Sequence, residues 1–191
     1  MSQSIINQPI SMVEEDEATG EVAELYDTVK RELHMPFVPN MIKTLGVSPA
    51  ALAIHMGMFQ AMYAHLTLPQ SLVAMISYTV AEYANCEYCS VNNELMCRTL
   101  GIDEETLAQV ARDLGNVNPE RVRVIIQFCL KVSKYPQRVT NEDFDRLREL
   151  GVNDEEILEI VIVTAHAVSA DVIADTLKVP VESDVYAALG R

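Results

Sequence analysis

Signals that begin a helix recur along this chain of 191 residues, and no window shows sustained alternation of apolar and polar residues. Ser48 stands directly before Pro49, which places a capping hydroxyl before a proline at the first helical position. Asn153 lies three residues before Glu156 and forms a capping box with it. Strands would instead need a period of two residues. The sequence therefore predicts an all-α fold of about seven or eight helices.

The expected helix boundaries follow apolar residues at helical spacing between capping and turn signals. The main ranges are 17–32, 50–64, 67–85, 86–100, 103–115, 119–135, 140–151 and 153–177, with a short helix over 181–189 at the end. Between the first two lies HMPFVPN, residues 34–40, whose two prolines predict an extended connection.

Length and charge narrow the class of protein. We expect one domain over residues 1–191, with residues 1–16 as a loosely ordered N-terminal arm. The net charge of −14, from 28 acidic and 14 basic residues, repels nucleic acid phosphates and anionic membranes. The N-terminus lacks the pattern of a signal peptide, and no later run approaches a membrane span. These features predict a soluble cytoplasmic protein that binds neither nucleic acid nor membranes, and its 49% apolar content suits subunit contacts in a homo-oligomer.

The sequence CEYC, from Cys86 to Cys89, is the strongest chemical signal in the chain. Both cysteines fall in the first turn of a predicted helix, where unpaired N–H groups and the helix dipole favour a thiolate. One thiolate can then attack an oxidant while the other closes a disulfide on it. The motif and its position favour peroxide reduction or dithiol exchange, although Glu87 between the cysteines works against a lowered thiol pKa.

Two other interpretations of CEYC stay open on the motif alone. A structural zinc ion needs about four ligands, and the chain has no second C-x-x-C and no H-x-x-x-H, so neither a metal nor a bound cofactor is expected. The pair could also be two buried thiols that only pack. Packing is the expected role of Cys97 and Cys129, which have no partner cysteine nearby in the sequence.

Three stretches together resemble the alkyl hydroperoxidase D and carboxymuconolactone decarboxylase superfamily. They are EATGEVAELYDTVKRELHMPFVPNMIKTLGVSPAAL (17–52), LPQSLVAMISYTVAEYANCEYCSVNNELMCRTLG (68–101) and DEEILEIVIVTAHAVSADVIADTLKVP (154–180). The peroxidase-related branch with the F-V-P-N connection is the most similar. The ordered combination covers nearly the whole chain and is far more specific than C-x-x-C alone.

The resemblance implies an oligomeric all-α peroxidase that reduces organic hydroperoxides with the C-x-x-C pair. In that family the second cysteine, here Cys89, attacks the peroxide. The first, here Cys86, then resolves the sulfenic acid into a redox-active Cys86–Cys89 disulfide, with no bound cofactor. The resemblance further implies that a dithiol reductant, such as a lipoyl-bearing or thioredoxin-like protein, returns the electrons.

Two positions depart from the family pattern. Its proton relay uses a glutamate twelve residues before the first cysteine and a histidine four residues after the second, and this chain has Ala74 and Asn93 there. A positioned base commonly contributes about a hundredfold or more in rate, so the site is expected to be weakened. Glu82, one turn before Cys86, is the nearest replacement carboxylate, and the Asn93 amide could donate a hydrogen bond to a thiolate without carrying a proton.

The histidines at positions 55, 65 and 166 are expected to be structural rather than catalytic, because a lone histidine on an apolar face is more often a core residue. His166 is the first to inspect, since its segment usually carries polar residues in the resembling family. Two alternative functions remain: a carboxymuconolactone decarboxylase that does not depend on the cysteines, and a non-enzymatic redox sensor or oligomeric interaction protein.

Overall fold

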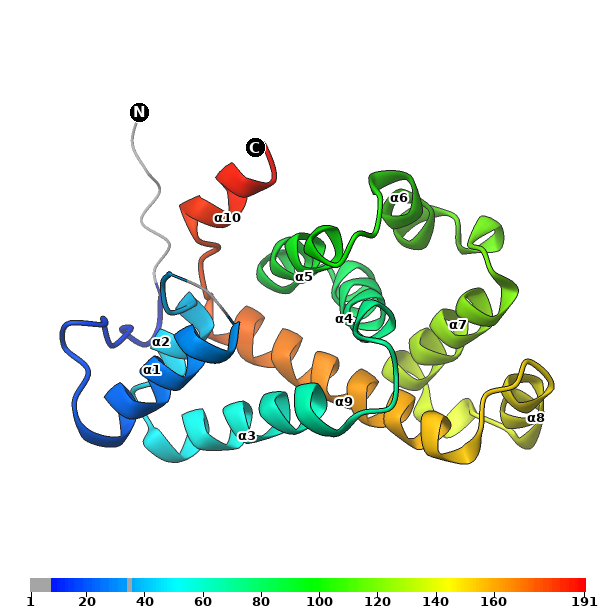
Figure 1. Ribbon diagram of the computed structural model, residues 1–191, viewed down its shortest axis with the longest axis horizontal. Coiled ribbons are helices and arrows are strands. Elements are labelled where there is room, and N and C mark those ends of the chain that lie inside the picture. The colour runs from blue at the N-terminus through cyan, green and yellow to red at the C-terminus, as the bar shows by residue number, and fades with distance from the viewer. Residues whose placement is uncertain (1–7, 34–35) are drawn as a thin grey trace.

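The computed structural model describes residues 8–33 and 36–191, and within them the chain forms ten α-helices, two short 3₁₀ helices and no strand (Figure 1). The α-helices are α1 (Gly20–Leu33), α2 (Asn40–Leu45), α3 (Pro49–His65), α4 (Gln70–Ala84), α5 (Glu87–Thr99), α6 (Glu104–Arg112), α7 (Glu120–Lys134), α8 (Asn141–Glu149), α9 (Asp154–Leu177) and α10 (Ser183–Ala188). The all-α prediction is confirmed. The helices are more numerous than the expected seven or eight, and α2 was not anticipated because it has only six residues.

The predicted helix starts are confirmed at the atomic level. The Ser48 hydroxyl accepts a hydrogen bond from the backbone N–H of Ala51 at the start of α3. At the start of α9, Asn153 and Glu156 bond reciprocally to each other's backbone N–H groups at 3.0 and 2.9 Å. Such caps satisfy the N–H groups that the first helical turn leaves unpaired, so they fix where each helix begins.

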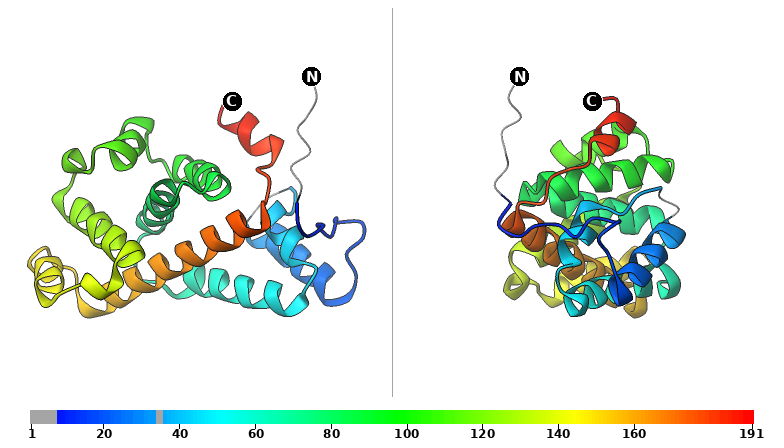
Figure 2. Two further views of the ribbon diagram at one scale, coloured as in Figure 1. Left: turned by 180° about the vertical axis from the view of Figure 1, so that it is seen from behind. Right: turned by 90° about the vertical axis from the view of Figure 1, so that its left-hand side faces the viewer.

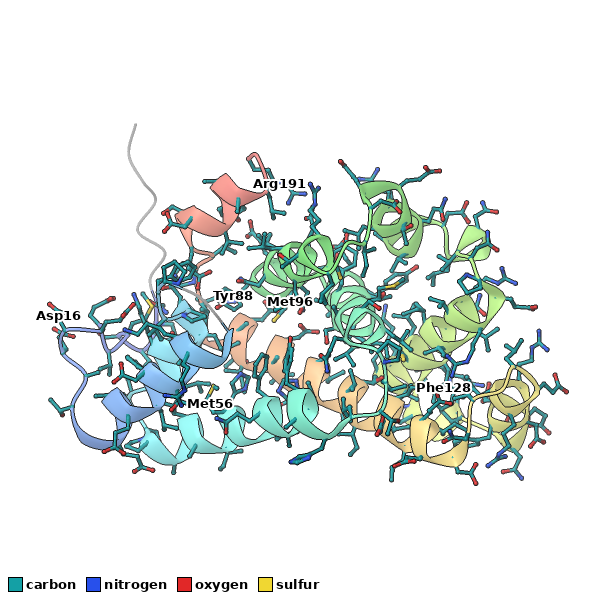
Figure 3. All side chains as sticks on the ribbon, viewed as in Figure 1. Asp16, Met56, Tyr88, Met96, Phe128 and Arg191 are labelled. Atoms are coloured by element: carbon teal, nitrogen blue, oxygen red, sulfur yellow. The ribbon has the colours of Figure 1, made fainter. Side chains whose placement is uncertain are left out.

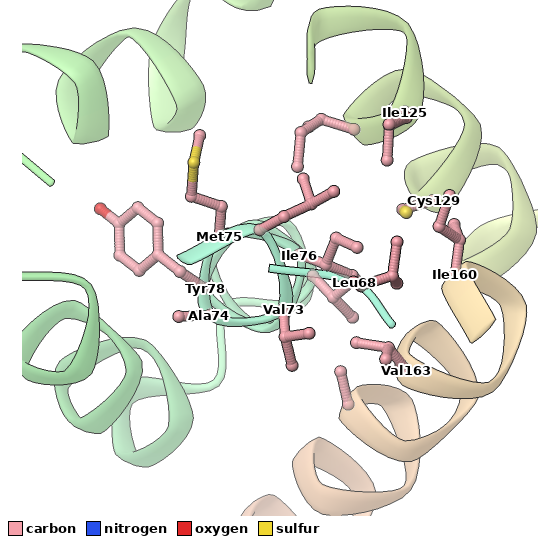
Figure 4. Close-up of a cluster of buried hydrophobic side chains, with 14 of the residues drawn as sticks. Leu68, Val73, Ala74, Met75, Ile76, Tyr78, Ile125, Cys129, Ile160 and Val163 are labelled. Atoms are coloured by element: carbon pink, nitrogen blue, oxygen red, sulfur yellow. The ribbon is translucent and has the colours of Figure 1, made fainter. Parts of the chain in front are cut away.

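Helix α4 lies at the centre of the larger core. Figure 4 shows Ile76 on α4 directed toward the side where Cys129 on α7 and Ile160 and Val163 on α9 lie. Cys97 and Cys129 are both fully buried in this core, as expected from their sequence context. A helix that is apolar on nearly all sides, as α4 is, is stable only when other helices surround it.

A second apolar cluster packs α1, α2 and α3 against the C-terminal half of α9 and against the CEYC motif. In Figure 1 α9 runs from α8 at one end of the molecule to α1–α3 at the other, and Figure 2 shows the same arrangement from behind. Because α9 has 24 residues, it is long enough to take part in both clusters. The thiols therefore lie where the two halves of the molecule meet.

Helix α9 also corrects one expectation. By length and composition alone it is long and apolar enough to cross a membrane, whereas no segment of that kind was expected from the sequence. Core helices of soluble proteins pass the same test, and α9 packs against α4, α5, α7 and α8 here.

The N-terminal segment is more firmly attached than expected over the residues that the structure describes. The backbone N–H of Val13 donates to the carbonyl of Lys43, and the Tyr26 hydroxyl donates to the Val13 carbonyl. Glu14 pairs with Lys43 and Glu15 with Lys30, at 2.9 and 3.0 Å. Residues 13–15 are thus fixed to α1 and α2 rather than loosely ordered, and residues 1–7 of the predicted arm lie outside the described residues.

Candidate active site

A tight turn between α4 and α5 places the first cysteine. Asn85 adopts the left-handed conformation with φ of 60° and ends α4, with its N–H donating to the carbonyl of Glu82. The N–H of Cys86 donates to the carbonyl of Ala81, which completes a Schellman motif. Cys86 is then the N-cap of α5, and its carbonyl accepts from Ser90. The local sequence thus folds α5 back against α4 with the motif at the junction.

Both thiols are buried beside a carboxylate from the other end of the chain. The sulfur atoms of Cys86 and Cys89 and a carboxylate oxygen of Asp171 lie within 4.8 Å of one another. Cys86 Sγ also lies 4.0 Å from the backbone carbonyl oxygen of Asp171. All three residues are buried, with exposed fractions of 0%, 6% and 5%. The structure therefore brings the predicted cysteine pair together and adds Asp171 to it.

The carboxylate of Asp171 is unusual because it is buried without a conventional donor. Neither of its oxygens accepts a hydrogen bond from an N–H or O–H group of the described residues. Burial raises the pKa of Asp171 to about 6, although the facing thiols of Cys89 and Cys86 oppose this shift. A carboxylate with a raised pKa is a stronger base, so Asp171 is suited to accept a proton near neutral pH.

The Cys89 thiol is correspondingly hard to ionise in the reduced, resting site. Its hydrogen bond with Cys86, its burial and the negative charge of Asp171 all raise the pKa of Cys89 well above its usual range. The helix start was expected to favour a thiolate, and here the neighbouring thiol, burial and carboxylate outweigh the helix dipole. A reaction that uses the Cys89 thiolate would therefore need a base, and a carboxylate oxygen of Asp171 lies within 4.8 Å of the Cys89 sulfur.

A cavity of about 410 Å³ opens beside the cysteines. Residues of α3, α4, α5 and α9 line it, together with the α2 segment, and most of them are apolar: Met41, Ile42, Met56, Phe59, Met62, Val73, Leu95 and Met96 among others. Figure 3 labels Met56 on α3 and Tyr88 and Met96 on α5, around the space between these helices. Cys89 and Asp171 line the cavity, whereas Cys86 does not. The arrangement makes Cys89 the cysteine that a cavity ligand meets.

Tyr88 fixes the motif to the F-V-P-N connection. Its hydroxyl accepts a hydrogen bond from the backbone N–H of Met41 at 3.1 Å and donates to the buried carboxylate of Glu182 at 3.2 Å. The Asn92 amide donates to the Tyr88 carbonyl at 3.0 Å. The aromatic residue between the cysteines therefore has a structural role, since it joins α5 to α2 and to the segment before α10.

The other predicted site residues fall in different places. Ala74 and Asn93, which occupy the family's relay positions, both line the cavity. Glu82 lies half-buried near the end of α4 and is not among the residues that line the cavity. Glu82 also does not belong to the cluster of Cys86, Cys89 and Asp171. The supporting roles of Glu82 and Asn93 stay predictions.

Two histidines of the described residues, for which a structural role was expected, lie in the cavity wall. His55 on α3 and His166 on α9 line the cavity, with ring centroids 5.4 Å apart and planes at 29°. His65 lies exposed at the end of α3, outside the cavity. His166, singled out as the first to inspect, is therefore a lining residue.

The three clustered groups could also hold a thiophilic cation. Cys86, Cys89 and Asp171 offer two sulfur atoms and one oxygen, a donor set that zinc accepts when a fourth position is left open. The sequence motifs alone offered too few ligands, because Asp171 lies far from the cysteines along the chain. Experiments on the thiols should include a chelator for this reason.

Asp171 was missed because it lies 82 residues beyond Cys89 in the sequence. A signal was nevertheless present. Buried positions of α9 recur at helical spacing through Ile160, Val163 and Ala167, and Asp171 continues the same series before Ala174. A carboxylate in register with an apolar face must be buried, which is unfavourable unless it is paired or functional.

Comparisons with known proteins agree with the fold. Neither a protein-family model nor a curated protein sequence matches the chain. The alkylhydroperoxidase AhpD core of an uncharacterized peroxidase-related protein from Ralstonia eutropha JMP134 superposes with a TM-score of 0.83, at 25% identity over 92% of this chain and 93% of that one. An uncharacterized peroxidase-related protein from Silicibacter sp. TM1040 gives a TM-score of 0.80, at 21% identity over 94% and 92% of the two chains.

A third solved structure is that of the debrominase Bmp8, with a TM-score of 0.81 at 19% identity over 97% of this chain and 98% of that one. A variant of Bmp8 with one cysteine replaced by alanine has been solved in complex with 2,3,4-tribromopyrrole. These likenesses cover 92–97% of the chain. They confirm the resemblance to the alkyl hydroperoxidase D superfamily, and the chain has the alkyl hydroperoxidase D-like fold.

Proposed function

We propose that the protein reduces organic hydroperoxides with the thiols of Cys86 and Cys89. The observation that carries the proposal is the asymmetry of the pair: Cys89 lines an apolar cavity, and Cys86 is fully buried behind it, close enough to resolve an oxidised Cys89. A peroxide with an apolar substituent would be bound by the lining side chains and would meet Cys89 first.

The reaction balances with the groups that the structure brings together. Asp171 takes the proton of Cys89, and the thiolate attacks the outer oxygen of the hydroperoxide, so that the O–O bond breaks and an S–O bond forms. The leaving alkoxide takes a proton from Asp171 and departs as the alcohol. Cys86 then attacks the sulfenic sulfur, and water leaves as the Cys86–Cys89 disulfide forms. The dithiol thus loses the two electrons that the peroxide gains.

The disulfide must be reduced before the next turnover. A dithiol reductant, of the lipoyl-bearing or thioredoxin-like class, would attack one sulfur, form a mixed disulfide and resolve it with its second thiol. This exchange would restore both cysteines and oxidise the reductant. It requires an exchange partner that reaches the rim of the cavity, where Cys89 is the slightly exposed member of the pair.

The proposal is tested with reduced, chelator-treated protein and cumene hydroperoxide. We expect one intramolecular disulfide per chain, mapped by mass spectrometry to Cys86 and Cys89, with release of 2-phenyl-2-propanol. Cys89→Ser should abolish peroxide consumption, and Cys86→Ser should consume one equivalent and stop at the sulfenic acid. Cys97→Ala is the matched control, because Cys97 does not line the cavity. Unchanged consumption in Cys89→Ser would overturn the proposal.

Reductive dehalogenation is a second candidate, favoured by the apolar cavity that is large enough for a substituted ring. A thiolate would take bromine from carbon as a sulfenyl bromide, the carbon would take a proton, and the second thiol would displace bromide to give the same disulfide. Bromide release from 2,3,4-tribromopyrrole, measured with dithiothreitol as reductant and lost in Cys89→Ser, would support it. Protein that consumes cumene hydroperoxide and releases no bromide would exclude this candidate.

A further inference from the structure

The two cavity histidines form a stacked pair. The rings of His55 and His166 stack on each other, and neither imidazole makes a hydrogen bond or ion pair with another described residue. His166 is 92% buried, and its Nε2 atom is enclosed without any hydrogen-bond partner among the described residues. A buried polar atom without a partner commonly costs about 1–3 kcal/mol, so a ligand that supplies the partner is favoured.

Both imidazoles are neutral at physiological pH. Burial and the neighbouring ring of His166 lower the pKa of His55 to about 4, and burial also lowers the pKa of His166. A neutral imidazole offers one N–H donor and one acceptor nitrogen. The pair can therefore recognise an uncharged group that both donates and accepts, such as a hydroxyl, more readily than an anion.

The pair lies away from the thiols along α9. His166 is five residues before Asp171, which corresponds to about 7.5 Å of helix rise. The cavity that joins them is lined mainly by apolar side chains, among them Met56, Phe59 and Met96. A ligand that reaches both ends would thus have an apolar, ring-sized middle and a polar group at each end.

We propose that His55 and His166 form a subsite for an uncharged hydrogen-bonding group of the substrate, at the end opposite its reactive oxygen. The substrate class is an aromatic or similarly compact hydroperoxide that carries a hydroxyl group across the ring. This inference rests on the proposed function for the reacting end, but the subsite itself can be measured by binding alone.

The test compares two inert product analogues by calorimetry with reduced protein. They are 2-phenyl-2-propanol and 4-(2-hydroxypropan-2-yl)phenol, which differ only by the phenolic hydroxyl. Because a neutral hydrogen bond is worth about 1 kcal/mol net, the wild-type protein should bind the phenol about fivefold more tightly. His166→Phe should bind both alcohols equally, and His166→Gln, which keeps a donor and an acceptor, should retain part of the preference.

His65→Phe is the matched control, since His65 is on the same helix as His55 but outside the cavity, and it should keep the full preference. The preference is a ratio within one variant, so a modest loss of folded protein leaves it unchanged. Equal binding of the two alcohols by the wild type, no binding of either, or a full preference in His166→Phe would each overturn the inference.

The two proposals can fail separately. Protein that reduces cumene hydroperoxide but shows no preference for the phenol would overturn the subsite and leave the peroxidase intact. Protein that binds the phenol preferentially through His166 but consumes no hydroperoxide would support the subsite and overturn the peroxidase.

Discussion

In the proposed reaction Asp171 serves as the base, because Ala74 cannot carry a proton and Asn93 cannot exchange one at neutral pH. The resembling family places its glutamate and histidine on the helices that here are α4 and α5, whereas the carboxylate of this chain comes from α9. It nevertheless faces both thiols. The chain therefore lacks the usual relay residues, but a carboxylate that can accept a proton still lies beside the thiols.

The first prediction concerns the pH dependence of Cys89 oxidation. With a pKa of about 6, Asp171 is a carboxylate above pH 6 and cannot accept the thiol proton below it. The rate constant for oxidation by cumene hydroperoxide should therefore rise through about pH 6 in the wild type. Asp171→Asn should lose this rise and be about a hundredfold slower at pH 7, measured by rapid quench and thiol alkylation.

Asp175→Asn is the matched control for the pH profile. Asp175 is exposed, one turn after Asp171, and its negative charge raises the pKa of Asp171. The variant should keep the rise and shift it to slightly lower pH. If Asp171→Asn retained the wild-type profile, the proton acceptor would have to be another group.

The second prediction concerns stability, and its sign follows from the same pKa. The pKa of Asp171 is raised in the folded protein from its usual value of 3.8, so its contribution to stability is present at low pH and is lost as pH rises through about 6. Asp171→Asn removes this loss. Urea unfolding of reduced protein should show the variant gaining about 1 to 2 kcal/mol relative to wild type between pH 5 and pH 8.

Asp175→Asn again serves as the control, and it should show a much smaller change over the same range. The free energies of unfolding of wild type and Asp171→Asn could instead differ by the same amount at every pH between 5 and 8. That result would mean that Asp171 titrates near its ordinary value. The unfolding data and the kinetic profile together distinguish two cases. In one, Asp171 acts as the base and lowers the stability of the folded protein when it is ionised; in the other, Asp171 is a buried group with no role in the chemistry.

The cysteine pair could be predicted from the sequence, and Asp171 and the histidine pair could not, for a physical reason. Cys86 and Cys89 are joined by one turn of helix, so spacing alone places them together. Asp171 reaches the thiols, and His166 reaches the cavity, only because α9 packs against α4 and α5, which is a tertiary event. Local patterns determine what a helix buries but not which helix it will face.

At the scale of elements, the α4–α5 turn is the feature on which the site depends. Asn85 occupies the left-handed region that disfavours most side chains, and the Schellman bonds follow from that conformation. The turn sets Cys86 as the N-cap of α5 and directs Cys89 into the cavity wall. Tyr88 then holds α5 against α2 through Met41.

The third prediction tests this turn. Asn85→Gly should leave the free energy of unfolding within about 0.5 kcal/mol of wild type or raise it, because glycine adopts the left-handed conformation freely. Asn85→Val should lose about 1–2 kcal/mol, since a β-branched residue is strained there. Urea midpoints measure the stability, and the rate of Cys86–Cys89 disulfide formation reports the geometry.

The side chain at position 85 is exposed, so lost packing is not expected to contribute to either result. The disulfide should form at the wild-type rate in Asn85→Gly and more slowly in Asn85→Val. Equal stability of the two variants would show that the left-handed turn is not what fixes Cys86.

At the scale of the whole molecule, capping signals predicted most helix ends, and α2 and the attachment of residues 13–15 escaped prediction. The ends could be predicted because the N-caps at Ser48 and Asn153 are satisfied by residues three positions away. Helix α2 is short and has no side-chain cap, so no local sequence signal predicts it. The contact of Val13 with Lys43 joins segments 30 residues apart and depends on how α1 and α2 pack.

Helix α9 carries apolar side chains on its outer face as well as its inner one. Leu158, Ile162 and Val172 are 64%, 46% and 60% exposed, and they recur at helical spacing along one side. On α3, Ile54 and Met58 are similarly exposed at 69% and 40%. Helices that are apolar on all sides are usually buried on all sides, so these faces favour contact with further copies of the chain.

The last prediction is that the protein self-associates through the outer face of α9. Sedimentation velocity should show an oligomer, and Leu158→Glu with Ile162→Glu should shift it toward the monomer, because two buried carboxylates would oppose contact. Each chain carries a net charge of −14, so copies repel one another and added salt should strengthen association. Leu100→Glu, at an exposed apolar residue outside α3 and α9, should leave the distribution unchanged. A wild-type protein that sediments as a monomer at high salt and high concentration would contradict the prediction, and would leave α9 as a helix whose apolar outer face remains in water.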